Sequence, residues 1–194
     1  MKKTQQYSEM SDEQLMALVK EGHKFAFAEI YDRYAGKLFS FFFRMLNKDE
    51  NKARDFMQDV FLKLIEKPGA YDPHRPFSTW LFNIAYNLCK NEYRRQNVRE
   101  SYSIEKLNEI RQEASPELEY FSIDLQSFEK QLTMALNNMD EAHRLVFILR
   151  YQQELPVKEI AALIDCPEGT VKSRLFYATR SLATTLSVFD PKKN

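Results

Sequence analysis

Hydrophobic residues recur every three to four positions along almost the whole chain, which predicts helices and no strand. Near the N-terminus, Ser11 and Gln14 form a capping-box pattern at the start of a short helix. In that helix Leu15, Leu18 and Val19 share one face. Helices with one apolar face must bury it against one another, so the pattern predicts an all-α protein.

Three longer helices are predicted in the N-terminal half. The first begins near Lys24, and its packing seam is predicted to consist of Ala28, Tyr31, Ala35, Leu38, Phe42 and Met45. The second spans residues 51–66, and the third spans residues 77–96 after a proline-rich loop.

Residues 98–126 are polar, acidic and only weakly periodic, which predicts a flexible linker that can contain some helix. They divide the chain into two parts with clear apolar periodicity. We therefore predict two small helical domains, 1–97 and 127–194, joined by a flexible acidic linker.

Residues 155–182 predict a helix-turn-helix, with a first helix from Pro156 and a turn at 165–169. The second helix buries one face, formed by Val171, Leu175, Ala178 and Leu182. The side chains expected to point away from this buried face are those of Thr170, Lys172, Ser173, Arg174 and Tyr177. A face rich in hydrogen-bond donors suits base edges and phosphates. An ordinary helical hairpin with a solvated face is the alternative.

The helix predicted over 77–96 carries a second signal for nucleic-acid binding. One stripe is apolar and consists of Leu81, Ile84, Ala85, Leu88 and Cys89. Another holds Trp80, Asn83, Asn87, Lys90, Asn91 and Arg94. Amides can read base edges, an indole can stack on an unpaired base, and cations hold phosphates. A solvated polar face, with Trp80 covering the core, is the alternative.

The helix predicted over 51–66 has both charged and apolar side chains on its outward face. They are Asp55, Gln58, Asp59, Leu62 and Lys63, with Phe61 beside them. Apolar and charged side chains together on an exposed face suit a protein partner. From the residues alone, a simple solvated face is the better explanation of this set.

Charge and composition narrow the possible functions. Basic and acidic residues balance at 28 each, so nucleic-acid binding would need local patches. Residues 86–99 hold four basic side chains and one acidic, whereas 100–124 hold seven acidic and two basic. The three histidines are scattered, and Cys89 and Cys166 lie far apart, which gives no metal or disulfide pattern. We expect no cofactor, no metal and no catalysis.

We expect both cysteines to be small buried hydrophobic residues of a protein in a reducing compartment. The polar N-terminal residues are followed by no apolar run, so we expect no signal peptide and no membrane insertion. The expected location is the cytoplasm.

Three segments together resemble the bacterial sigma factors of the extracytoplasmic-function group. They are residues 53–65 (ARDFMQDVFLKLI), 77–91 (FSTWLFNIAYNLCKN) and 165–175 (DCPEGTVKSRL). Other regulators share the last motif, but all three in this order are highly specific. The resemblance implies a transcription initiation factor that binds core RNA polymerase, directs it to −35/−10 promoters and promotes DNA melting.

The resemblance also assigns binding surfaces. Docking on the clamp helices of polymerase would use Asp55, Gln58, Asp59, Phe61, Leu62 and Ile65. The −10 element would meet Tyr71, Asp72, His74, Arg75, Phe77, Trp80, Asn83, Asn87, Lys90, Asn91 and Arg94, with the loop 71–77 capturing a flipped base. The −35 element would meet Thr170, Lys172, Ser173, Arg174, Phe176 and Tyr177. The acidic linker would thread through polymerase towards the RNA exit path, and an anti-sigma factor is a further partner that the family allows.

Two departures from the family pattern are visible. The loop carries Pro73 and Pro76 in place of the commoner glycine-containing form, and Tyr177 stands where a basic residue is frequent. Two other hypotheses compete: a helix-turn-helix activator with an N-terminal sensor domain, and an interaction protein that sequesters a regulator. The Trp80–Asn87–Lys90 stripe argues against the first, and basic patches on two separate helices argue against the second.

Overall fold

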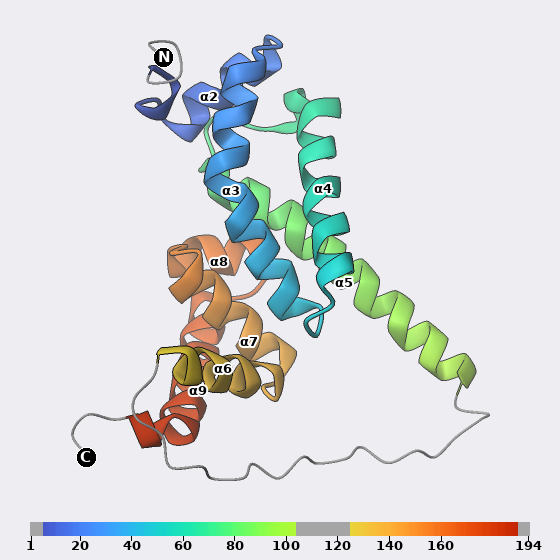
Figure 1. Cartoon of the computed structure of the whole chain (residues 1–194), viewed down its shortest axis with the longest axis vertical. Coiled ribbons are helices and arrows are strands. Elements are labelled where there is room, and N and C mark those ends of the chain that lie inside the picture. Colours follow the sequence, from blue (N-terminus) through green and yellow to red (C-terminus); the bar gives the residue numbers. More distant parts are fainter. Residues whose placement is uncertain (1–5, 104–124, 190–194) are drawn as a thin grey trace.

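The computed structural model describes residues 6–103 and 125–189, which are helical and contain no strand (Figure 1). The N-terminal half holds α2 (Asp12–Lys20), α3 (Lys24–Met45), α4 (Glu50–Glu66), the turn η1 (Pro68–Ala70) and α5 (Phe77–Ser103). The C-terminal half holds α6 (Leu125–Asn137), α7 (Glu141–Phe147), the π-helical turn η2 (Ile148–Gln152), α8 (Val157–Ile164), α9 (Glu168–Thr185) and the turn η3 (Ser187–Phe189). The predicted all-α class is confirmed.

Local capping explains where several helices begin. The Ser11 hydroxyl accepts the Gln14 N–H at 3.3 Å, and the Gln14 amide oxygen accepts the Ser11 N–H at 2.9 Å. This reciprocal pair is the predicted capping box. Asp49 caps α4 by accepting the Lys52 N–H at 3.0 Å. Both contacts are made by side chains that lie near in sequence.

The core-facing stripe of α3 differs from the predicted seam in its first half. Ala26, Ile30 and Tyr34 are buried there, whereas Ala28 and Tyr31 are exposed. In the second half the predicted core residues are buried: Leu38, Phe42 and Met45. Because α3 carries apolar residues on several faces, its periodicity fits two stripes, and tertiary contacts choose between them.

Arg33 helps to determine which stripe of α3 is buried, because its side chain bonds α3 to the N-terminal segment. Its guanidinium donates to the carboxylates of Asp12 and Glu29, at 2.8 Å each, and to the Ser8 carbonyl at 2.8 Å. The neighbouring Tyr34 hydroxyl donates to the Asp12 carboxylate. These contacts hold Tyr34 in the interior, whereas Tyr31, one turn earlier, stays 40 % exposed.

The two halves of the molecule pack on one another (Figure 1). Helix α5 lies against α8, and α3 lies against α6 and α7. The Thr79 hydroxyl of α5 donates a hydrogen bond to the Glu159 carboxylate of α8. One buried apolar cluster runs from Leu15 in α2 to Leu175 in α9, so the halves share a core.

The predicted linker, residues 98–126, is helical at both ends. Helix α5 continues to Ser103, past its predicted end at Gln96, and α6 begins at Leu125. No glycine or proline interrupts residues 97–103, so nothing local stops α5 earlier. The rest of the linker, including its predicted path through polymerase, lies outside the described residues. The domain boundaries stay a prediction.

Candidate DNA- and polymerase-binding surfaces

Helix α5 presents a polar stripe opposite its buried face. The side chains of Asn87, Lys90, Asn91 and Arg94 are exposed, and Asn83 is half-buried. The Asn87 amide donates to the Asn83 amide oxygen at 3.1 Å. On the other side of the helix the predicted core residues are buried or half-buried: Leu81, Ile84, Ala85, Leu88 and Cys89. The fold thus brings two amides and two cations onto one accessible face.

Three aromatic rings hold the loop before α5 in place. The Tyr71 ring lies 5.5 Å from the Phe77 ring and 5.2 Å from the Trp80 ring, centroid to centroid. Tyr71 is 8 % exposed and Phe77 is fully buried. Burial raises the pKa of Tyr71 to about 12, and its hydroxyl donates to the Arg75 carbonyl at 2.7 Å. Tyr71 and Phe77, which the resemblance assigns to the −10 element, are buried and anchor the loop, with Trp80 half-buried beside them. Their contact with DNA stays a prediction.

The tip of the loop is polar and exposed. The Asp72 carboxylate accepts the His74 N–H at 3.0 Å, and the Arg75 N–H donates to the Asp72 carbonyl at 3.0 Å. At the far end, the Phe77 N–H donates to the Glu13 carboxylate of α2 at 3.2 Å. The tip is therefore fixed by local bonds while Asp72, His74 and Arg75 stay accessible.

Helix α4 exposes most of the predicted polymerase-docking set. Asp55, Gln58 and Asp59 are exposed, and Leu62 and Ile65 are about half exposed, at 53 % and 52 %. Exposed apolar patches rimmed by polar residues often mark a protein-binding surface.

Phe61 departs from this prediction because it is only 4 % exposed. Its ring packs 4.7 Å from Tyr31 and 6.0 Å from Phe27, both on α3. Phe61 therefore lies beneath the predicted docking surface and packs against α3. Tyr31, 40 % exposed beside it, is a surface residue that sequence reasoning missed, because only the pairing of α3 with α4 brings it there.

Helices α8 and α9 form the predicted helix-turn-helix. Asp165 ends α8 with a left-handed φ of 53°, and Pro167 takes the N-cap of α9. Pro156 likewise stands at the N-cap of α8, one position before the first helical residue. The predicted inner face of α9 is buried: Val171, Leu175, Ala178 and Leu182.

The outer face of α9 is only partly accessible. Lys172, Ser173, Phe176 and Tyr177 are exposed, whereas Thr170 and Arg174 are half-buried. Burial raises the pKa of Tyr86 on α5, and the nearby charge of Arg174 opposes that shift. The arginine of the predicted −35 set thus lies close to the helix of the predicted −10 set.

The described residues were also compared with what a metal site or a membrane-spanning helix requires. Within residues 6–103 and 125–189, no three His, Cys, Asp or Glu side chains converge as a metal site would require. In that same part of the chain, no helix has the length and apolarity to cross a membrane. Both cysteines are free, and burial raises the pKa of the fully buried Cys89 thiol.

Comparison with known proteins gives a consistent result. Residues 30–99 match the family described as Sigma-70 region 2, and residues 129–182 match Sigma-70 region 4. The chain is 30 % identical over 187 residues to the ECF RNA polymerase sigma factor SigW of Bacillus subtilis, covering 92 % of this chain and 98 % of SigW. It is 29 % identical over 181 residues to the ECF RNA polymerase sigma-E factor of Haemophilus influenzae, covering 88 % and 92 %.

Two solved structures share the fold. The sigma factor RpoE of Bartonella quintana, crystallised with the anti-sigma factor NepR, is 26 % identical with a TM-score of 0.66, covering 84 % of this chain and 97 % of RpoE. CnrH, in complex with the cytosolic domain of CnrY, is 22 % identical with a TM-score of 0.66, covering 91 % and 97 %. The chain therefore belongs to the extracytoplasmic-function sigma factors of the sigma-70 family, non-enzymatic initiation factors that bind RNA polymerase and direct it to promoters.

Proposed function

We propose that this sigma factor divides promoter reading between its halves, with α5 and the loop 71–77 reading the −10 element and α9 reading the −35 element. One observation carries the proposal: Asn87, Lys90, Asn91 and Arg94 form an accessible stripe on a helix whose opposite face is buried. A donor-rich stripe on a rigid helix suits a nucleic acid. Since polymerase and promoter DNA share the cytoplasm, we place the protein there.

Melting follows from capture of a base at the stripe. A base that leaves the stack costs a few kcal/mol, and a pocket that binds it offsets that cost. Asn87 supplies an amide for the base edge, and the loop tip at Asp72–Arg75 lies ahead of the same helix. Lys90 and Arg94 would follow the phosphates of the displaced strand. Buried Tyr71 and Phe77 keep the loop shaped for this task.

Docking to core polymerase is assigned to the exposed face of α4. Asp55 and Asp59 offer charge, and Leu62 and Ile65 offer apolar contact area. A surface of this composition gains steering from the carboxylates and binding energy from the aliphatic side chains.

Promoter binding requires the two halves to separate. In the packed arrangement Arg174 is half-buried and close to Tyr86 of α5, so α9 cannot offer its whole outer face while α5 lies beside it. By its likeness to a relative crystallised with an anti-sigma factor, we propose that this chain also has such a partner, which holds it away from polymerase.

The division of labour is tested by crossing protein variants with promoter variants. Holoenzyme carrying Asn87→Ala should lose discrimination among −10 sequences and keep its −35 preference, and Arg174→Ala should do the reverse. Asn138→Ala, an exposed amide in the C-terminal half, is the matched control. The assignment would be wrong if either variant shifted preference at the other element.

A further inference from the structure

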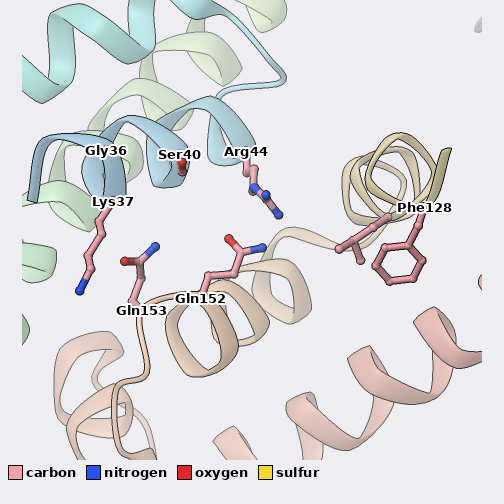
Figure 2. Close-up of a pocket in the computed structure, with 8 residues that line it drawn as sticks. Gly36, Lys37, Ser40, Arg44, Phe128, Gln152 and Gln153 are labelled. Atoms are coloured by element: carbon pink, nitrogen blue, oxygen red, sulfur yellow. The ribbon is translucent and has the colours of Figure 1, made fainter. Parts of the chain in front are cut away.

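A cavity of about 420 Å³ lies between α3, α6 and the end of the turn η2 (Figure 2). Its lining includes Lys37 of α3, Phe128 of α6 and Gln152 of η2. None of the described residues of the loop 71–77 or of α5 lines this cavity. A base captured at the polar stripe of α5 would therefore be held elsewhere, between that stripe and the loop. Its fit then depends on how firmly the loop is positioned.

Helix α5 begins directly after a residue that cannot cap it with its side chain. The first backbone bond of the helix runs from the Trp80 N–H to the Pro76 carbonyl at 3.2 Å, so Pro76 takes the N-cap position. The proline side chain has no oxygen that could accept the free N–H groups of the first turn. Phe77, the first residue of the helix, is fully buried, so its N–H needs a partner within the protein.

Glu13 of α2 supplies that partner from a distant part of the chain. Its carboxylate accepts the Phe77 N–H at 3.2 Å, across 64 positions of sequence. A carboxylate suits this place because the N-terminus of a helix carries a partial positive charge. Burial is the main cause of the raised pKa of Tyr71, and the charge of Glu13 is the second. One side chain of α2 therefore acts on the residues at both ends of the loop.

Helix α2 is itself fixed by side chains of α3. The Asp12 carboxylate accepts from the Arg33 guanidinium at 2.8 Å and from the Tyr34 hydroxyl. The Tyr34 ring in turn lies 5.4 Å from the Phe77 ring, centroid to centroid, at an interplanar angle of 76°. Two neighbouring residues of α2 therefore restrain Phe77. Glu13 bonds its backbone, and Asp12 holds the tyrosine that packs on its ring.

We propose that Glu13 is a positioning residue for −10 recognition, which holds the loop 71–77 at the start of α5 before DNA binds. A loop that is already ordered loses less conformational entropy when it captures a base. The proposal rests on the proposed role of this loop in reading the −10 element. It extends that role to α2, a helix whose residues are in neither of the predicted DNA-binding sets.

Hydrogen exchange of the free full-length chain, followed by NMR, tests the positioning without DNA. Glu13→Ala removes the acceptor, so the Phe77 amide hydrogen should exchange about tenfold faster than in the parent, as expected for one lost hydrogen bond to a charged group. Glu13→Gln keeps an amide oxygen that can accept this N–H and should restore most of the protection. Glu9→Ala removes an exposed carboxylate ahead of α2 and should match the parent. Parent-like exchange at Phe77 in Glu13→Ala would overturn the proposal.

Promoter opening tests whether this positioning serves −10 reading. Holoenzyme with Glu13→Ala should open duplex promoters about fivefold more slowly, the cost expected for one lost capping bond, and should discriminate less among −10 sequences. Its −35 preference should stay that of the parent, and Glu13→Gln should recover most of the opening rate. An equal loss of preference at both elements would mark a general defect of folding and would contradict a positioning role.

Asn87→Ala, measured in parallel, separates failure of this inference from failure of the proposed function. If Asn87→Ala loses −10 discrimination and Glu13→Ala keeps it, the loop reads DNA without help from α2 and the inference is wrong. If neither variant loses discrimination, the assignment of α5 to the −10 element is wrong, and the role of Glu13 in reading it is refuted as well.

Discussion

Replacing Asn87 by alanine should impair promoter opening without weakening the fold. The side chain is exposed, and its one hydrogen bond with a described residue goes to Asn83 on the same helix. Losing an exposed bond of this kind changes the free energy of unfolding by about 0.5 kcal/mol or less, and alanine's better helix propensity offsets part of that. A base contact made by an amide contributes about 1–3 kcal/mol of discrimination. Since 1.4 kcal/mol is a factor of ten, open-complex formation should fall roughly 5- to 150-fold.

The assay follows open-complex formation by holoenzyme on duplex promoter DNA, using a fluorescent base in the −10 element. A template with a premelted bubble removes the cost of opening, so the variant should recover most of its rate there and still discriminate poorly among −10 bases. Asn138→Ala should behave like the parent throughout. If Asn87→Ala opened duplex promoters at the parent rate with the parent −10 preference, the base pocket would have to lie elsewhere.

Three further predictions concern other parts of the molecule. Asp59→Arg should weaken co-elution with core polymerase while its thermal unfolding matches the parent, because Asp59 is exposed; unchanged co-elution would remove α4 from the interface. Lys172→Ala should weaken promoter binding and flatten its dependence on salt, as expected for a lost phosphate contact, and a parent-like slope would count against that contact. Burial raises the pKa of Tyr71 to about 12, so its contribution to stability is complete below pH 10 and declines as the pH rises towards 12. Urea unfolding across that range should show a smaller alkaline loss for Tyr71→Phe, and superimposable profiles would contradict the burial argument.

The parts of the fold that the sequence predicts well are the ones set by near neighbours. The capping box at Ser11 and Gln14 and the inner face of α9 depend on residues within a turn or two of each other. Their patterns therefore contain the necessary information.

The parts that sequence reasoning missed depend on distant segments. Phe61 is buried because Tyr31 and Phe27 of α3 cover it, and Tyr71 is buried because Phe77 and Trp80 pack on it. A motif marks such residues as belonging to a site without saying whether they face the ligand or support the residues that do. The half-burial of Arg174 against the opposite half is likewise invisible in the sequence of α9.

The most direct test of the account is run-off transcription with purified core polymerase on genomic fragments. Addition of the protein should give discrete transcripts whose start sites share one −10 and one −35 sequence. Point changes in the shared −10 sequence should abolish those transcripts in the parent and be discriminated poorly by Asn87→Ala. No transcripts above those of core polymerase alone, or transcripts without a shared upstream sequence, would contradict it.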